Sequence, residues 1–223
     1  MRQLLEIAED ARRAKYTVAK LGTNDKNRAL LAIADALEAR ADEIIAANAA
    51  DIENGRAAGL NDGLIDRLML DKKRIAGIAE GCRQVAALPD PVGEVLWMRR
   101  RPNGLNIGQK RVPMGVIGII YEARPNVTVD AAALCFKAGS ACILRGGKEA
   151  FRSNNAIAEV LRDAIESAGL PRDSVQLVQD TSRASSVELM GMTEYLDLLI
   201  PRGGAGLIRA VVENAKVPVI ETG

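Results

Sequence analysis

Basic, glycine-flanked turns follow several apolar segments of this sequence, and their residue types suit the binding of phosphate. A guanidinium or ammonium group supplies positive charge there, and the neighbouring glycine amides offer free N–H donors to an anion. The turns are residues 121–126 after the segment 116–120, residues 145–148 after 141–144, and residues 201–204 after 196–200. We therefore expect anion binding at these turns.

Arg145 is the strongest single candidate. It ends an apolar segment, where an unpaired charge is unfavourable, and Gly146 and Gly147 carry no side chains that could shield it. Its guanidinium fork matches a phosphate group. The alternative is an ion pair with Glu149 or with a carboxylate on a nearby helix. Lys148 is either a further phosphate ligand or a solvated loop lysine.

Arg202 stands in a similar position, followed by Gly203 and Gly204. A phosphate contact is again one interpretation. Asp197 and Glu194 are near in the sequence, so a structural ion pair is the other.

Four polar residues at strand ends have open roles. Glu122 and Arg124 favour an internal salt bridge that shapes the first turn, with a substrate contact as the alternative. Asn126 is interpreted as the N-cap of the following helix rather than as a catalytic donor. Glu221 follows the apolar run 217–220 and is either a base at a strand end or an ordinary carboxylate.

Several familiar catalytic motifs are missing. The sequence has neither a G-x-G-x-x-G dinucleotide fingerprint nor a G-x-x-x-x-G-K-[ST] phosphate loop. It contains no histidine, which excludes serine–histidine triads and histidine-ligated zinc. The three cysteines, Cys82, Cys135 and Cys142, lack metal-ligand spacing and the electropositive setting of a nucleophile, so we interpret them as reduced, buried thiols of a cytoplasmic protein, with no metal site.

The composition is that of an ordinary globular protein. The 223 residues are 48% hydrophobic and 26% charged, with a net charge of +1 and 3% aromatic residues, which argues against binding to nucleic acid. Acidic residues interrupt the N-terminal segment, so it does not read as a signal peptide. No apolar run approaches the length of a membrane span.

The first part of the chain is predicted to be helical. Apolar spacings of three and four residues indicate helices over 2–20, 24–47 and 71–87, with a glycine-containing loop between the last two. Thr23 or Asn24 is a candidate cap for the second helix. Residues 95–101 and 105–112 are predicted as a β-hairpin, whose basic residues form either a solvated face or part of an assembly arm.

From residue 113 onward, strands and helices alternate. The predicted strands are 116–120, 141–144, 175–178, 196–200 and 217–220, and the predicted helices are 127–138, 154–168, 183–191 and 205–215. This alternation predicts an α/β fold with a parallel, Rossmann-type sheet and helices on both faces. Ligands of such sheets bind at the carboxyl ends of the strands, where the basic turns lie.

The sequence also resembles a known family along its whole length. The segment 112–128 reads VPMGVIGIIYEARPNVT, and together with the segments 101–105, 130–134, 143–147, 200–204 and 217–220 it resembles the γ-glutamyl phosphate reductases, or glutamate-5-semialdehyde dehydrogenases. The resemblance implies an aldehyde dehydrogenase-like fold. Residues 1–94 would then be the N-terminal helical part of the cofactor domain, 95–112 part of an oligomerisation arm, and 113–223 the βα cofactor-binding region.

The resemblance also implies a reaction, the second step of proline biosynthesis from glutamate. A cysteine thiolate displaces phosphate from L-glutamyl 5-phosphate, and NADPH then reduces the thioester to glutamate 5-semialdehyde. By position, Arg145 would lie near the adenosine ribose and suit the 2′-phosphate of NADPH, with Gly146 and Gly147 beside it. Arg202, Gly203 and Gly204 would lie near the pyrophosphate. Glu221 would fall near the general base of hydrolytic relatives.

In this family the catalytic cysteine lies beyond the segment whose first residues are 217–223. We therefore expect it beyond Gly223, with the catalytic domain absent from this chain and the chain alone inactive. The family further implies a homo-oligomer and an association with glutamate 5-kinase. The alternatives are a non-catalytic nucleotide-binding or assembly module and a hydrolytic aldehyde dehydrogenase.

Overall fold

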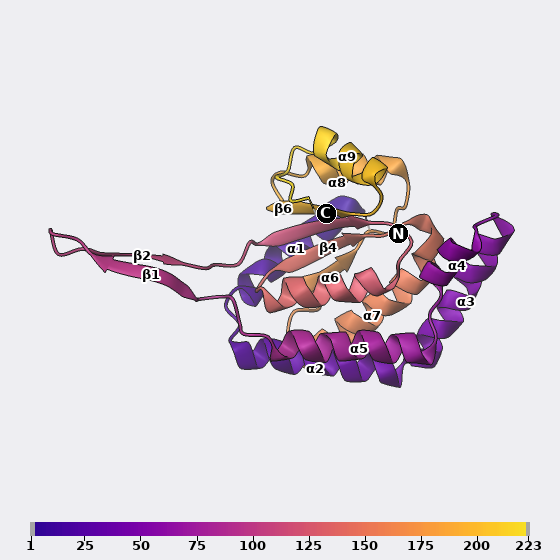
Figure 1. The fold of residues 1–223 in the computed structure, drawn as a ribbon, viewed down its shortest axis with the longest axis horizontal. Coiled ribbons are helices and arrows are strands. Elements are labelled where there is room, and N and C mark those ends of the chain that lie inside the picture. The colour runs from indigo at the N-terminus through magenta and orange to yellow at the C-terminus, as the bar shows by residue number, and fades with distance from the viewer. Residues whose placement is uncertain (1–2, 222–223) are drawn as a thin grey trace.

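The structure is a computed structural model that describes residues 3–221, an α/β body from which a two-stranded arm projects (Figure 1). The helices are α1 (Leu4–Val18), α2 (Thr23–Ala39), α3 (Ala41–Ala57), α4 (Asp62–Leu68), α5 (Lys72–Ala87), α6 (Asn126–Lys137), α7 (Phe151–Ser167), α8 (Arg183–Gly191) and α9 (Ala205–Asn214), with short 3₁₀ turns η1 (Lys148–Ala150) and η2 (Arg172–Ser174). The strands are β1 (Val95–Arg100), β2 (Asn106–Lys110), β3 (Val116–Tyr121), β4 (Ala141–Arg145), β5 (Val175–Leu177) and β6 (Leu198–Arg202).

The central sheet has the strand order β5-β4-β3-β6, and all of its pairs are parallel. Both faces of the sheet are covered, which explains why the strands are apolar throughout rather than alternating. Along β3, Ile117, Ile119 and Tyr121 pack into one core, whereas Val116 and Ile120 pack into the other. The predicted α/β fold with helices on both faces is confirmed.

Two helical layers form these cores. The larger core joins one face of the sheet to α6 and α7, with α2 and α5 packed outside them (Figure 1). The smaller core joins the opposite face to α1, α8 and α9. The larger core also encloses the ammonium of Lys26, which donates to Asp90 over 2.6 Å and so fastens α2 to the segment that leads into the arm.

The arm is the antiparallel pair β1–β2, and every residue of both strands is exposed. Its apolar side chains include Leu96, Trp97, Met98 and Ile107. An isolated two-stranded ribbon is only marginally stable in water. The predicted hairpin is confirmed, and its apolar side chains are exposed at the surface.

Three local predictions are wrong. The helix predicted over 24–47 is two helices that meet at Arg40, whose guanidinium bonds to both Glu43 and Asp163. The glycine-containing loop is largely helical, because Gly55 packs tightly against the side chains of Leu60 and Ile65. The segment 217–220 contributes one bridge, between Val219 and Leu199, rather than a full strand.

The predicted cap of α2 is also wrong. The N-cap is Gly22, and the hydroxyl of Thr23 donates instead to Asp90 over 2.9 Å. Within residues 3–221, no helix is both long and apolar enough to cross a membrane.

Candidate functional site

The strand order creates a switch point at the carboxyl edge of the sheet. From β3 the chain moves outward to β4 and β5, and it then returns to place β6 on the other side of β3. The helices that follow these strands consequently lie on opposite faces, and the loops after β3 and β6 separate. In open α/β sheets, ligands bind at this point.

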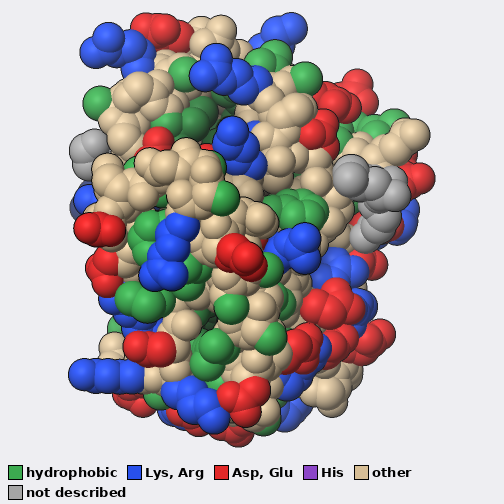
Figure 2. Space-filling model, turned by 90° about the vertical axis from the view of Figure 1, so that its right-hand side faces the viewer, with side chains coloured by type: hydrophobic (Ala, Val, Ile, Leu, Met, Phe, Trp, Pro, Cys, Tyr) green, Lys and Arg blue, Asp and Glu red, His purple; other side chains and the backbone are tan. Residues whose placement is uncertain are grey.

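Among the hollows at this edge are two that the basic turns line. The first, the β4 crevice, has a volume of about 650 Å³ and lies between the loop after β4 and the helices α8 and α9. The second, the arginine pocket, has a volume of about 450 Å³ and lies between the loops after β3 and β6. Glu122 is the one lining residue that they share. Figure 2 views the molecule from the end where α3 and α4 lie, and basic side chains gather round a recess in its upper half.

Arg145 lies in the β4 crevice but its guanidinium is already engaged. Nη2 donates to the carbonyl oxygens of Thr181 and Ser182 over 2.6 and 2.8 Å, and Nη1 donates to that of Gly146 over 3.2 Å. Burial lowers the pKa of Arg145, while the charge of Asp180 opposes this shift. The pairing with Glu149 that the sequence allowed is not among its bonds. Arg145 therefore fastens the loop before α8 to the end of β4.

Close packing explains the two glycines after Arg145. A Cβ atom on Gly146 would lie 2.2 Å from Nδ2 of Asn154, and one on Gly147 would lie 2.7 Å from the carboxylate of Glu149. Asn154 is buried and accepts from Thr128 over 3.0 Å, so it cannot easily move away. These glycines bring the backbone of the turn against the floor of the crevice.

Two other cations of the crevice have no such engagement. Lys148 and Arg183 both line it and are exposed, and neither has a side-chain hydrogen bond or ion pair within residues 3–221. Lys148 begins η1 directly after the glycine turn, and Arg183 begins α8. The crevice therefore presents two available positive charges at its rim.

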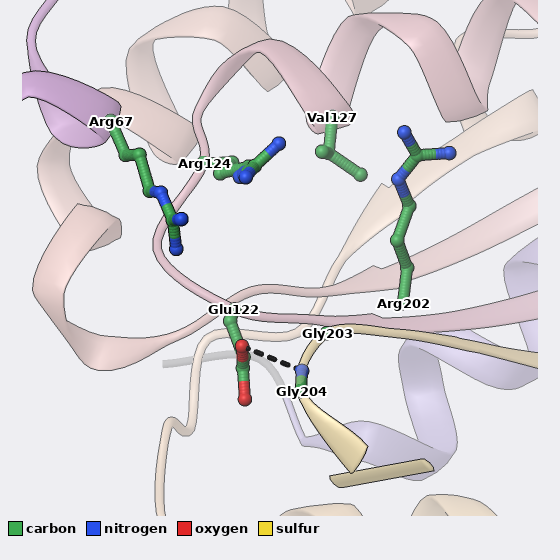
Figure 3. A pocket seen from close by; sticks show the side chains of 7 residues that line it. All are labelled: Arg67, Glu122, Arg124, Val127, Arg202, Gly203 and Gly204. Carbon is green, nitrogen blue, oxygen red and sulfur yellow. Dashed lines mark hydrogen bonds between the residues drawn. The ribbon is translucent and has the colours of Figure 1, made fainter. Parts of the chain in front are cut away.

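The arginine pocket collects three guanidinium groups from separate parts of the chain. Arg67 comes from α4, Arg124 from the loop after β3, and Arg202 from the end of β6. Figure 3 shows Arg67 and Arg124 pointing into a space that Arg202 borders from the other side. The carboxylate of Glu122 turns away from them and accepts from the amide of Gly204 over 3.0 Å.

This arrangement corrects two sequence-based interpretations. The salt bridge between Glu122 and Arg124 is not formed, because the carboxylate caps the turn at Gly204 instead. Arg202 does not pair with Asp197, whose carboxylate accepts from Lys15 and from the amide of Val116.

Asn126 is not an N-cap either. Pro125 occupies that position, and Asn126 is the first residue of α6. Its Nδ2 donates to Asp130 over 3.1 Å, one turn along the helix. The side chain thus bonds within α6 and leaves the first turn uncapped.

Sequence reasoning missed Arg67, because it follows no apolar strand and the region around it was predicted as a loop, whereas it lies on α4. Its position depends on the buried side chain of Asn48 in α3. Nδ2 of Asn48 donates to the carbonyl of Leu68 over 2.8 Å, and Oδ1 accepts from the amide of Leu70 over 2.7 Å. The end of α4, and with it Arg67, is thereby fixed to α3.

Glu221 and the cysteines lie apart from both hollows. Glu221 is exposed and lines neither of them. Cys82, Cys135 and Cys142 are all buried, and burial raises the pKa of Cys82 to about 12. None of the three presents a reactive thiolate at the carboxyl edge.

Comparisons with known proteins agree along the whole chain. The model of the aldehyde dehydrogenase family matches residues 2–221. The γ-glutamyl phosphate reductase of Heliobacterium modesticaldum is 61% identical over 96% of this chain and 51% of its own length. That of Carboxydothermus hydrogenoformans is 57% identical over 100% of this chain and 54% of its own length. The chain thus spans about half the length of the curated relatives it matches.

Solved structures give the same result for the fold. The crystal structure of γ-glutamyl phosphate reductase from Thermotoga maritima superposes with a TM-score of 0.97 at 45% identity, covering 100% of this chain and 54% of that one. A probable aldehyde dehydrogenase from Listeria monocytogenes has a TM-score of 0.75 at 15% identity over 98% of this chain and 45% of its own, a likeness of fold alone.

Proposed function

Because this chain belongs to the aldehyde dehydrogenase family, we propose that it forms the cofactor-binding part of an NADPH-dependent γ-glutamyl phosphate reductase. The observation that carries the proposal is the identity along the whole chain to proteins of that name. The proposed overall reaction converts L-glutamyl 5-phosphate, NADPH and a proton into L-glutamate 5-semialdehyde, NADP⁺ and phosphate, and it belongs to proline biosynthesis. When bound, NADPH supplies the hydride.

The β4 crevice supports the binding of a dinucleotide. Its volume lies in the range of sites for ligands of this size. Gly147 lines the crevice, so the turn after Arg145 presents backbone rather than a side chain there. Arg145 holds the loop before α8 and so shapes the wall. The resemblance predicts in addition that Arg202, Gly203 and Gly204 contact the pyrophosphate; these residues line the arginine pocket, so this prediction competes with the assignment of that pocket to another anion below.

We assign recognition of the 2′-phosphate to Lys148 and Arg183 rather than to Arg145. The guanidinium of Arg145 donates to three carbonyl oxygens, which leaves it few directions for a further ligand. Lys148 and Arg183 line the same crevice and are available. A charge-assisted bond to phosphate is about twice as strong as a neutral one. NADPH should therefore bind more tightly than NADH.

Fluorescence titration of the reduced nicotinamide tests this assignment. NADPH should bind at least about tenfold more tightly than NADH, and Lys148→Ala or Arg183→Ala should remove most of that difference without weakening NADH. Arg209→Ala is a matched control, because Arg209 is exposed on α9 and lines neither hollow. Equal affinity for the two cofactors in the unaltered chain would contradict the NADPH assignment. If only Arg145→Ala removed the preference for NADPH, the contact to the 2′-phosphate would belong to Arg145.

The thiolate step is proposed to use a cysteine other than Cys82, Cys135 and Cys142, because all three are buried away from the hollows. This chain should therefore bind NADPH without turning over semialdehyde, phosphate and NADP⁺. Appearance of NADPH in that mixture, if abolished by replacing one of the three cysteines, would show that a buried thiol does reach the substrate.

The arm is proposed to serve in assembly, as the resemblance implies. Leu96, Trp97, Met98 and Ile107 expose apolar surface on a ribbon that projects from the body (Figure 1). Sedimentation equilibrium should show self-association, and Trp97→Lys should weaken it. A monomer at all concentrations would contradict this role.

A further inference from the structure

The arginine pocket has a concentration of positive charge that its own lining neutralises only in part. None of the guanidinium groups of Arg67, Arg124 and Arg202 has a hydrogen bond or salt bridge within residues 3–221. The one acid that lines the pocket, Glu122, bonds to the amide of Gly204 and pairs with none of the three arginines, so the cations outnumber the acid in the lining. Clustered cations repel one another, and a bound anion relieves that repulsion.

One acid outside the lining acts on Arg202. This acid is Asp130 on α6, which interacts electrostatically with Arg202 and accepts a hydrogen bond from Asn126 over 3.1 Å. Burial raises the pKa of Asp130, while Asn126 and Arg202 act in the opposite direction. Of the three arginines, Arg202 is the one whose charge acts on Asp130, and no hydrogen bond or ion pair joins the two side chains within residues 3–221.

The pocket also offers directed donors besides charge. Each guanidinium presents N–H groups in a planar fork that matches two oxygens of a phosphate. The loop through Gly203 and Gly204 leads into α9, with Gly204 as the N-cap of this ten-residue helix. The carboxylate of Glu122 accepts from the amide of Gly204 and so already occupies the positive end of this helix, which leaves the guanidinium groups as the donors for a further anion.

The pocket is separate from the space assigned to the dinucleotide. The β4 crevice is lined by Arg145, Lys148 and Arg183, none of which lines the arginine pocket, and Glu122 lies between the two. A dinucleotide whose 2′-phosphate and pyrophosphate both bind in the crevice leaves the three arginines for another anion. The two hollows meet at the switch point between β3 and β6, where a second reactant can approach.

We propose that the arginine pocket binds the phosphoryl group of the acyl phosphate substrate and, after reaction, the same group as inorganic phosphate. This inference rests on the proposed function for the identity of the anion. Arg67 and Arg124 grip the group from the side of α4 and α6, and Arg202 grips it from β6. Binding in this pocket orients the acyl carbon toward the junction with the crevice and places the leaving phosphate beside three cations.

Titration calorimetry with inorganic phosphate at constant ionic strength tests the pocket directly. Arg67→Ala and Arg124→Ala should each weaken phosphate binding by about tenfold or more, and Arg124→Lys should lie between Arg124→Ala and the unaltered chain. Arg209→Ala should change the affinity by less than about twofold. Because Arg67 and Arg124 are exposed and their side chains make no hydrogen bond or ion pair within residues 3–221, the variants should unfold near the temperature of the unaltered chain.

The same variants titrated with NADPH distinguish the substrate phosphate from the cofactor pyrophosphate. Arg67→Ala and Arg124→Ala should leave NADPH affinity unchanged. Equal losses for phosphate and NADPH would place the pyrophosphate in the pocket and overturn the proposal. Unchanged phosphate affinity in both variants would also overturn it. If the unaltered chain bound phosphate through these arginines but did not bind NADPH, the cofactor proposal would fail and the arginine pocket would stand.

Discussion

The side-chain amide of Asn48 is buried and helps to fix the position of α4. Replacing this side chain should show how much stability the amide contributes. Asn48→Ala removes the side chain that joins α3 to the end of α4. The carbonyl of Leu68 and the amide of Leu70 then lose their partners in a buried region. Ser153 also loses the bond from Asn48, but its hydroxyl keeps its bond to Asp51 over 2.6 Å.

The cost follows from the two orphaned backbone groups. Each unpaired buried group costs about 1–3 kcal/mol, and water that enters the space vacated by the side chain recovers part of this. Alanine also favours a helix over asparagine by roughly 0.5 kcal/mol. The net loss in the free energy of unfolding should therefore be about 2–4 kcal/mol.

Urea unfolding of Asn48→Ala measures this loss, and Asn54→Ala is the matched control. Asn54 is exposed on the same helix, so its replacement should stay within about 0.5 kcal/mol of the unaltered chain. The folded Asn48→Ala variant should also bind phosphate severalfold more weakly, because Arg67 directly precedes Leu68. A loss below about 1 kcal/mol would refute the reasoning about the orphaned groups.

Three further outcomes are expected. Burial raises the pKa of Asp90, but the hydrogen bonds from Lys26, Val92 and Thr23 outweigh this effect and lower the pKa. Asp90→Asn should therefore destabilise the chain near neutral pH. The difference in stability between the variant and the unaltered chain should shrink as the pH falls through about 4 and below. A difference independent of pH would contradict the pairing. Gly146→Ala places a Cβ 2.2 Å from Asn154 and should cost about 1–3 kcal/mol in thermal unfolding, whereas an unchanged melting temperature would show that the turn can shift. A thiol reagent at mildly alkaline pH should leave all three cysteines unmodified in the folded chain and modify all three in urea. The reason is that burial raises the pKa of Cys82 to about 12 and shields the other two thiols. Rapid labelling of the folded chain would contradict that shielding.

The βα part of the fold could be predicted because each signal was local. The strands are continuous apolar runs, as strands buried on both faces must be, and α7 carries a single apolar stripe. Where tertiary contacts decide, the sequence was less informative. The break at Arg40 has no glycine or proline to announce it, and Gly55 is helical because its missing side chain admits Leu60 and Ile65.

The candidate site could likewise be predicted only in part. Residues at strand ends could be placed at one edge of the sheet, since parallel strands end together, and Glu122, Arg124 and Arg202 do meet there. Their partners could not be predicted, because the choice of the Gly204 amide by Glu122 depends on how two distant loops approach. Arg67 reaches the pocket only through the packing of α4 against α3, which has no counterpart in a local motif.

The central place of β3 has a consequence for how the molecule is made. β3 pairs with β4 on one side, but its other neighbour, β6, is synthesised only after β4, α7, β5 and α8. Pairing at long sequence separation is slow, because the intervening chain must first lose conformational freedom. The edge between β3 and β6, which carries the arginine pocket, is therefore expected to be the last part of the sheet to assemble. Phosphate can favour only the finished arrangement, so it should slow unfolding without hastening the early steps of folding.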